Sequence, residues 1–513
     1  MPYTLISPAN KSDHAVYTAL ASEGASRKAD VLGGKGFNLV LMSREMKLPV
    51  PPGFIIPTRY SHGADDDTTI NAHASTIDLF MKAVEVQAGR SFGDAKNPLL
   101  LSVRSGAPVS MPGMMDTILN VGLTAANVKG LAATTNPDFA WDSYRRLVVM
   151  YASTVCGADV EPLNEAYADA REFAKLPERA LLPAALAEKL IASYKSTLGD
   201  AFVPQDVAQQ LHECIKAVWR SWNSERAKTY RDLENIPHDL GTAVTVQTMV
   251  FGNLNDQSGT GVAFTRNPNT GEDVRFGDFL VAAQGEDVVD GSSKTLPLSN
   301  MASVFPDAAA ELEKAMDRIV KHYKGDLCDI EFTVEDGKLY MLQARIGKRS
   351  AAANVAITLD RHAKSYITTA EATEILMAAV QNAQNATGTG DALDGSDLTC
   401  VATGLGAVPG VVVGRAAFTA KKAVAAAKKG PVILIRKETS PDDVAGMKAA
   451  AGILTATGGL VSHAAVVARG WDKPCVVGAD KMVVSSSMAM IGNKSIKPGD
   501  LVKIDGTTGQ IYI

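Results

Sequence analysis

Cysteine is scarce in this sequence, and its five residues are scattered without a CxxC pair. This pattern offers no cysteine zinc site and is typical of reduced thiols. No apolar run approaches the roughly 20 residues of a membrane-spanning helix, and the first residues lack a basic region followed by an apolar stretch. The net charge of −5 gives no general nucleic-acid footprint. We therefore expect a cytoplasmic protein that binds neither membranes nor nucleic acids.

The sequence has enough apolar residues for several hydrophobic cores. Hydrophobic residues make up 46% of the 513 residues, and this length predicts roughly three or four domains. β-rich segments, helical periodicity and glycine-rich loops alternate in blocks. They predict a multidomain α+β and α/β protein, in which an α+β domain contains a helical insertion. The expected parts are residues 1–123 (β-rich), 124–240 (helical), 241–348 (β-rich), 349–400 (helices, then a polar linker over 381–397) and 401–513 (a last compact part).

The segment Thr457–Gly470 carries the strongest chemical signal. It follows a predicted buried strand and precedes a predicted helix of small residues, Ala464–Arg469. The pair Gly458 and Gly459 lets the backbone approach a ligand closely, and the free N–H groups of the helix start favour an anion. His463, at this junction, can accept a phosphoryl group on a ring nitrogen.

A histidine that merely packs or caps at a helix start is the alternative, and a lone histidine would favour it. The glycine pair, Ser462 and the downstream segment 473–478 instead favour a phosphoryl-accepting His463. Cys475, in that downstream segment, is interpreted as a buried strand thiol.

A second glycine loop, Gly33-Gly34-Lys35-Gly36, opens a helix and contains one lysine. It lacks the GxxxxGK[ST] spacing of a Walker A loop, so a phosphate-binding loop and a simple helix-start turn both remain open. Arg104, at the end of a predicted strand, is well suited to binding a phosphate.

Magnesium ligands are expected on two neighbouring strands. Asp329 and Glu331 alternate with apolar residues and therefore share one strand face, and Gln343 and Arg345 lie on the returning strand. Glu331 and Gln343 face one metal only if they are paired, which favours an odd-length turn over a two-residue Asp-Gly turn. Oxygen ligands from two strands suit Mg²⁺ bound to nucleotide phosphates. The alternative is a solvated carboxylate face.

Nearly the whole chain resembles the N-terminal and central parts of pyruvate phosphate dikinase. The resemblance rests on several long motifs in family order: the Gly33–Gly36 loop, Ser102–Gly106, Met111–Thr117, Trp141–Arg146, Gly259–Pro268, Gln284–Val289 and the histidine segment. It implies an ATP-grasp nucleotide-binding domain with a helical insertion, followed by a swivelling phosphohistidine domain. The Met111–Thr117 segment resembles the dikinase more than phosphoenolpyruvate synthase.

The resemblance also implies roles for the candidate residues. His463 would be the catalytic phosphocarrier, with Gly458, Gly459 and Ser462 around its phosphoryl group. The remaining residues would serve ATP, AMP, phosphate and pyrophosphate. Lys35 and Arg104 would hold ATP phosphates, Asp329, Glu331 and Gln343 would serve Mg²⁺ and the phosphates, and Arg345 would support them, with Glu331 and Gln343 as the metal ligands.

Three departures from the family stand out. The family continues into a pyruvate-binding barrel, whereas this sequence stops at Ile513, so the final transfer is expected to need a barrel, either on a separate subunit or on a part of the protein that this sequence lacks. An arginine that usually follows Gln284–Val289 is absent, and Lys294 is the candidate replacement, although lysine lacks the bidentate fork. Val461 stands where plant members carry a regulatory threonine, so that control is not expected.

The function expected from the resemblance is ATP- and phosphate-dependent phosphorylation of His463, the nucleotide half of the dikinase reaction. Two alternatives remain open. The phosphohistidine could serve another acceptor, as in glucan dikinases and rifampicin phosphotransferases, or the chain could be a nucleotide-binding module without turnover.

Overall fold

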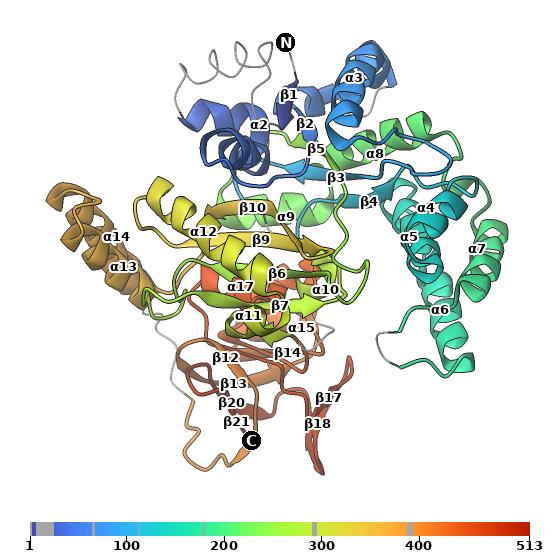
Figure 1. Ribbon diagram of the computed structural model, residues 1–513. Helices are drawn as coiled ribbons and strands as arrows, with labels where there is room; N and C mark the ends of the chain where they lie inside the picture. Colours follow the sequence, from blue (N-terminus) through green and yellow to red (C-terminus); the bar gives the residue numbers. More distant parts are fainter. Residues whose placement is uncertain are drawn as a thin grey trace. The chain divides into compact units, whose positions relative to one another are not determined.

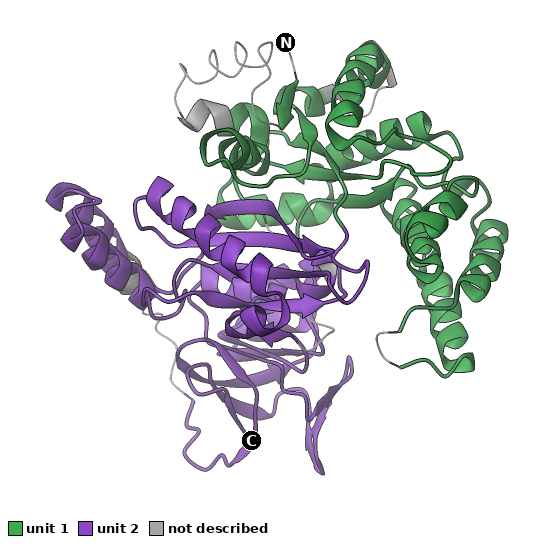
Figure 2. Ribbon diagram, in the orientation of Figure 1, with its two compact units in different colours: residues 1–250 green, residues 251–513 purple. Residues whose placement is uncertain are grey.

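The computed structural model describes residues 3–6, 25–63, 67–111, 113–177, 180–289, 295–386 and 393–513. Contacts divide the chain into two compact units, residues 1–250 and 251–513 (Figure 2). Both units combine helices with β-sheets, as the sequence predicted (Figure 1), and the division between them falls after residue 250. The expected boundary at 240/241 therefore lies ten residues too early relative to this division.

The first unit contains an antiparallel five-stranded sheet. Its strand β5 consists of Ala243-Val244-Thr245-Val246-Gln247-Thr248 and is buried throughout, as its β-branched residues favour. We expected this strand to begin the next part of the chain, but it pairs with β2 and β3 at the centre of the first sheet. In spatial order the strands are β1 (Thr4–Ile6), β2 (Gly53–Ile56), β5 (Ala243–Thr248), β3 (Leu101–Gly106) and β4 (Thr117–Val121).

Helices occupy most of residues 124–240, as predicted. Helix α5 illustrates why: the side chain of Asn136 caps the backbone N–H groups of Asp138 and Phe139, and Pro137 occupies the first turn. One face of α5 is then buried, including Trp141 and Tyr144. The helices here are α4 (Val128–Thr134), α5 (Pro137–Met150), η3 (Tyr151–Val155), α6 (Glu161–Phe173), α7 (Ala184–Leu198), η4 (Gly199–Ala201), α8 (Val207–Ser221) and α9 (Glu225–Glu234).

The remaining helices of the first unit precede this helical region. Helix α2 contacts β3 and β5 of the first sheet and is interrupted by a non-helical residue at Gly33. These helices are α2 (Ala25–Val40), η1 (Leu41–Glu45), η2 (Thr58–Gly63) and α3 (Asp67–Ala88).

The second unit begins with another antiparallel five-stranded sheet, which carries the predicted metal-binding residues. Strand β9 lies between β10 and β6, so its side chains are flanked on both sides. The strands, in spatial order, are β10 (Lys338–Ile346), β9 (Cys328–Glu335), β6 (Gly259–Phe264), β7 (Phe276–Val281) and β8 (Leu296–Pro297). The helices are α10 (Gly285–Val289), η5 (Leu298–Asn300), α11 (Met301–Val304), α12 (Pro306–His322), α13 (Ala351–Ala363) and α14 (Thr369–Ala386).

The linker expected over residues 381–397 begins later than predicted. Helix α14 continues to Ala386 because alanine, glutamine and asparagine do not interrupt a helix as glycine and proline do. Residues 387–392 lie outside the described ranges.

An eight-stranded mixed sheet completes the second unit. Strands β13, β14, β15 and β16 run parallel, and helices follow β13, β14 and β15. The last two strands, β20 and β21, form an antiparallel hairpin. In spatial order the strands are β11 (Cys400–Thr403), β21 (Gln510–Tyr512), β20 (Leu501–Asp505), β13 (Val411–Ala417), β14 (Val432–Arg436), β15 (Gly452–Thr455), β16 (Cys475–Val477) and β12 (Leu405–Val408).

Smaller elements decorate this sheet. The helices are α15 (Ala420–Ala427), η6 (Pro441–Asp443), α16 (Val444–Ala449) and α17 (His463–Gly470), and a separate small sheet contains β17 (Met482–Val484), β18 (Ala489–Ile491) and β19 (Lys494–Ile496). Across the described parts of the chain, we find no helix with the length and apolar character needed to span a membrane.

Candidate functional site

His463 is the first residue of α17, at the point where the chain leaves the parallel strand β15. The strand and the helix predicted around the motif are both present. Ser462 occupies the N-cap position with an extended backbone, but its side chain makes no capping hydrogen bond. Gly458 has a φ of 106° and lies in the preceding loop. The loop and helix start therefore have the strand–glycine–helix form expected of an anion-binding segment.

The ring of His463 contacts a residue from the neighbouring parallel strand. Thr439 Oγ1 lies 3.0 Å from His463 Nδ1, and Thr439 follows β14 as His463 follows β15. Burial lowers the pKa of His463 to about 4, while the nearby carboxylate of Asp443 acts in the opposite direction. The imidazole is therefore neutral near pH 7.

Three buried polar atoms around α17 have no hydrogen-bond partner among the described residues. They are Ser462 Oγ, His463 Nε2 and Arg469 Nη1. Unpaired buried polar groups are uncommon and are costly to maintain. Of these atoms, the imidazole nitrogen is the one that can form a bond to phosphorus, and the adjacent Ser462 hydroxyl is a hydrogen-bond donor.

The His463 segment is packed against the β6–β9 sheet within the second unit. The backbone N–H of Leu460 donates to Asp278 Oδ2 over 3.2 Å, and Arg469 Nε donates to Asn269 Oδ1 over 3.0 Å. Val461 is buried in one hydrophobic cluster with Val262 and other residues of this sheet. The loop that precedes His463 is therefore hydrogen-bonded to the sheet that carries the predicted metal-binding residues.

Gly459 is needed for this close approach. A Cβ atom at residue 459 would lie 2.9 Å from Asp278 Oδ2 and 2.8 Å from Thr295 Oγ1. Burial raises the pKa of Asp278, opposed by the Leu460 N–H and Thr295 hydrogen bonds and by the positive charge of Arg469. A larger residue at 459 would therefore displace the Asp278 and Thr295 side chains or the loop itself.

Glu331 and Gln343 are paired across β9 and β10, but not for the reason we predicted. The turn between the strands is the two-residue Asp336-Gly337 turn, with φ values of 48° and 77°. The expectation of an odd-length turn was wrong. A β-bulge at Leu342 shifts the register instead, so that Gln343 lies opposite Glu331 rather than Ile330.

The side chains on this face are already hydrogen-bonded to one another. Gln343 Nε2 donates to Glu331 Oε1 over 2.9 Å, and Arg345 Nη2 donates to Asp329 Oδ2 over 2.8 Å. Within the described ranges, no three His, Cys, Asp or Glu side chains converge as a metal cluster. One carboxylate and one amide oxygen are a partial ligand set, of the oxygen type that Mg²⁺ takes when phosphates supply further ligands.

In the first unit, the structure brings the loop of Lys35 next to the strand of Arg104. Gly33 has a φ of 68°, and a Cβ there would lie 1.7 Å from Gly106 O. Gly34 N donates to Ala107 O over 2.9 Å. The glycine loop is therefore fixed against the end of β3, two residues beyond Arg104, and this contact requires glycine at position 33.

Sequence reasoning missed three residues around His463, namely Thr439, Asp443 and Asp278. Thr439 and Asp443 lie in the connection between β14 and α16, and Asp278 lies in β7, so all three are distant from the histidine motif in the sequence. The only available signal for Thr439 was topological, since loops after adjacent parallel strands meet at one edge of a sheet. Lys294, the candidate replacement for the missing arginine, lies outside the described residues.

Cys475 is fully buried in β16, as predicted, and burial raises the pKa of its thiol to about 12. The thiolate is the reactive form, so this cysteine is inert near pH 7.

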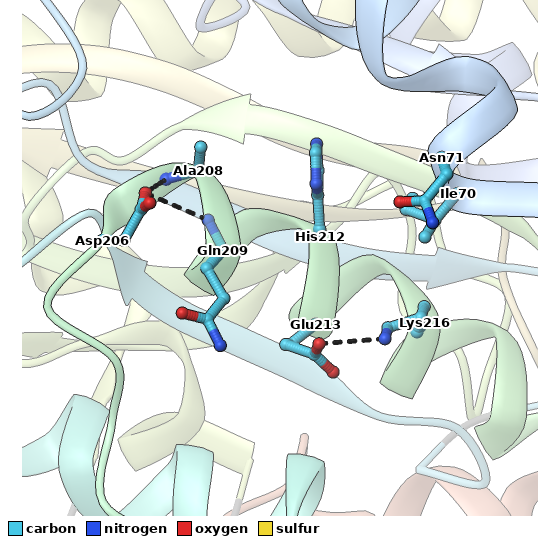
Figure 3. A pocket seen from close by; sticks show the side chains of 8 residues that line it. All are labelled: Ile70, Asn71, Asp206, Ala208, Gln209, His212, Glu213 and Lys216. Carbon is cyan, nitrogen blue, oxygen red and sulfur yellow. Dashed lines mark hydrogen bonds and ion pairs between the residues drawn. The ribbon is translucent and has the colours of Figure 1, made fainter. Parts of the chain in front are cut away.

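A polar groove of about 360 Å³ in the first unit lies between α3 and α8 (Figure 3). Three of its polar residues interact within the α8 segment: Asp206 caps the helix, and Lys216 Nζ donates to Glu213 Oε1 over 2.9 Å. None of the predicted site residues lines the groove, and we assign it no part in the chemistry. Its lining residues are Ile70, Asn71, Asp206, Ala208, Gln209, His212, Glu213 and Lys216.

The sequence matches two family models. The pyruvate phosphate dikinase AMP/ATP-binding domain matches residues 75–297 and 293–365, which together cover more than half of the chain. The mobile domain of PEP-utilising enzymes matches residues 428–509 and includes His463.

Whole-length comparison finds similar relatives in bacteria and plants. Pyruvate, phosphate dikinase of Clostridium symbiosum is 42% identical over 504 residues, which cover 96% of this chain and 57% of the relative. The protein of the same name from Rhizobium meliloti (strain 1021) is 42% identical over 519 residues, covering 97% and 57%. The chloroplastic pyruvate, phosphate dikinase 1 of Arabidopsis thaliana is 42% identical over 513 residues, covering 96% and 52%. The chain thus spans a little over half the length of these relatives, and it belongs to the pyruvate phosphate dikinase family.

Proposed function

We propose that this chain uses ATP to phosphorylate His463 and then passes the terminal phosphoryl group to inorganic phosphate. The observation that carries the proposal is the buried His463 ring, whose depressed pKa keeps it neutral and whose Nε2 atom has no partner among the described residues. A neutral imidazole nitrogen that is shielded from water and has no hydrogen-bond partner is a competent nucleophile. Relatives carrying the name pyruvate, phosphate dikinase support the choice of phosphoryl chemistry.

In the first step, the lone pair of His463 Nε2 forms a bond to the β-phosphorus of ATP. The bond between the β-phosphorus and the oxygen that bridges it to the α-phosphorus breaks, and AMP leaves with the electron pair of that bond. In the second step, an oxygen of inorganic phosphate attacks the terminal phosphorus. Pyrophosphate leaves, and one phosphoryl group remains on the histidine.

The hydrogen-bonded side chains of β9 and β10 are proposed to bind the nucleotide phosphates. Glu331 and Gln343 would hold Mg²⁺, which would neutralise phosphate charge when bound. Asp329 would orient Arg345, whose guanidinium is suited to phosphate oxygens. Lys35 and Arg104 of the first unit would bind ATP phosphates as well.

Gly458, Gly459 and Ser462 are proposed to serve the phosphoryl group on His463. Gly459 allows the loop to approach the sheet that contains β7, and Gly458 lies against Ser462, whose buried hydroxyl has no partner among the described residues. This hydroxyl would donate to a phosphoryl oxygen.

We infer an ATP-grasp architecture for the nucleotide-binding part, with residues 124–240 as its helical insertion. Its two sheet-bearing parts correspond to 1–123 and 241–348, with β5 grouped with the first sheet. Residues 349–400 would form the helical linker, and residues 401–513 would be a swivelling domain that carries His463 to its acceptor. Transfer to pyruvate would use a pyruvate-binding barrel, either on a separate subunit or in a longer chain.

Isotopic labelling tests the proposal. Incubation with Mg²⁺ and β-³²P-ATP should give acid-labile, base-stable label on the protein, and inorganic phosphate should leave that label in place. Label from γ-³²P-ATP should instead be released as pyrophosphate when phosphate is added. His463→Asn should abolish both labels, and Cys475→Ala should keep them. Equal labelling of the His463→Asn variant would disprove the assignment.

A further inference from the structure

Thr439 is the hydrogen-bonding neighbour of the His463 ring. It lies in the loop after β14, it is buried, and its Oγ1 is 3.0 Å from His463 Nδ1. The other ring nitrogen, Nε2, is buried without a partner among the described residues. The two nitrogens are therefore in different environments, and only Nδ1 faces a side chain that can fix its proton.

A neutral imidazole carries one proton, either on Nδ1 or on Nε2. A threonine hydroxyl can donate or accept, so either tautomer could pair with Thr439. Only the tautomer with the proton on Nδ1 leaves a lone pair on Nε2. In that arrangement Nδ1–H donates to Thr439 Oγ1, and the unpaired Nε2 atom can attack phosphorus.

The charges around the ring favour the same arrangement after reaction. When Nε2 forms its bond to phosphorus and AMP leaves, the proton stays on Nδ1 and the ring becomes positively charged. The carboxylate of Asp443 acts on this ring and favours its charged form. Thr439 Oγ1 can keep accepting the Nδ1–H hydrogen bond throughout, so it does not have to reorient.

We propose that Thr439 is a positioning residue that holds the proton of His463 on Nδ1, so that Nε2 takes the phosphoryl group. This inference deepens the proposed function and rests on it. Two variants separate the hydroxyl from the shape of the side chain. Thr439→Val removes the hydroxyl at nearly constant volume, and Thr439→Ser retains it.

The tautomer can be read directly by ¹⁵N NMR of the full chain labelled on its histidine rings, with His463→Asn identifying the signals. The wild-type protein and Thr439→Ser should show a protonated Nδ1 and an unprotonated Nε2. In Thr439→Val the two shifts should move toward each other as the second tautomer becomes populated. A protonated Nε2 in the wild-type protein would overturn the proposal, even if the valine variant did not fold.

Single-turnover labelling with β-³²P-ATP gives the second measurement. Loss of one hydrogen bond should slow Thr439→Val by roughly fivefold to tenfold, with Thr439→Ser within about twofold of the wild type. The ATP concentration for half-maximal rate should be unchanged, because Thr439 acts on the ring and not on the nucleotide. A wild-type rate together with unchanged ¹⁵N shifts in Thr439→Val would refute the assignment.

The two measurements keep the inference and the proposed function apart. Suppose that the wild-type ring has its proton on Nδ1 but that neither the wild type nor any variant acquires label. The phosphorylation proposal then fails, and the tautomer assignment stands. If the wild type acquires label and Thr439→Val matches it in both measurements, the role of Thr439 fails alone.

Discussion

His463 shows how burial selects the reactive form of a single residue. Removal from water lowers its pKa to about 4, because the charged imidazolium loses more solvation than the neutral ring. The same burial leaves Nε2 without a partner among the described residues. A nitrogen that is neutral and poorly solvated is a better nucleophile than one that must first shed a proton and water.

This shift predicts that stability depends on pH between the two pKa values of His463. The unfolded chain binds a proton near the ordinary pKa of 6.5, and the folded chain binds it only near 4. Stability contributed by the neutral ring is therefore complete above pH 6.5 and is lost as the pH falls toward 4, by on the order of 3 kcal/mol. In urea unfolding, the free energy of unfolding of the wild type should fall relative to that of His463→Asn as the pH is lowered. A pH-independent difference between the two would contradict the assigned burial.

Gly459 leads to a second prediction at this scale. Gly459→Ala places a methyl group 2.9 Å from Asp278 Oδ2, so either the Asp278 side chain, which accepts a hydrogen bond from Leu460 N–H, or the histidine loop must shift. We expect His463 labelling to slow by roughly tenfold. Gly470→Ala is the matched control, because its Cβ would meet Lys348 at an ordinary contact distance of 3.5 Å. Equal labelling rates in the two variants would show that the close approach does not matter.

In the hairpin of β9 and β10, the turn and a β-bulge together set which side chains share a face. Its two-residue turn alone would place Glu331 and Gln343 on opposite faces, and the bulge at Leu342 returns them to one face. One extra residue thus brings Glu331 and Gln343, the predicted metal ligands, to the same face of the hairpin.

We predict that Glu331→Gln raises the Mg²⁺ concentration needed for half-maximal labelling by roughly tenfold or more. Asp336→Asn is the matched control, since it removes one negative charge from the turn of the same hairpin. The control should leave the Mg²⁺ dependence unchanged, because asparagine tolerates the positive φ at this position. Identical Mg²⁺ curves for both variants would exclude Glu331 as a ligand.

Elements with a strong local signal could be predicted from the sequence. Periodicity and glycine placement predict the strand before His463 and the helix after it. They also predict the two strands of the β9–β10 hairpin. The bulge could not, because Met341-Leu342-Gln343 fits either register and only the sheet partners decide. Thr439 could not either, since a threonine in a loop carries no sign of the histidine that it meets. The assignment of β5 to the first sheet depends on long-range pairing in the same way.

At the scale of the whole molecule, the predicted residues are divided between the two units. Lys35 and Arg104 belong to the first unit, whereas the β9–β10 residues and His463 belong to the second. Within the second unit, hydrogen bonds to Asp278 and Asn269 hold the histidine segment against the sheet that contains β6, β7 and β9. The same contact also buries the apolar side chain of Val461 in a hydrophobic cluster with residues of this sheet.

Residues 1–513 should therefore perform the ATP half-reactions by themselves, including phosphate-dependent exchange between ATP and AMP. They should form no phosphoenolpyruvate from ATP, phosphate and pyruvate. A barrel domain added in trans should restore slow synthesis, because a covalent link normally raises the local concentration of a carrier to about the millimolar range. Discharge of the phosphohistidine by pyruvate alone would contradict this division of labour.

Thr439 and His463 lie in the segments that follow β14 and β15, two adjacent parallel strands of the same mixed sheet. The group that sets the proton on the ring is thus inherited together with the ring, whatever else is joined to the chain. Under the proposed function, a lineage could exchange one phosphoryl acceptor for another through gene fusion or a new binding partner, while the carrier itself remained chemically complete. Diversification would then act on the destination of the phosphoryl group and leave the nucleophile untouched.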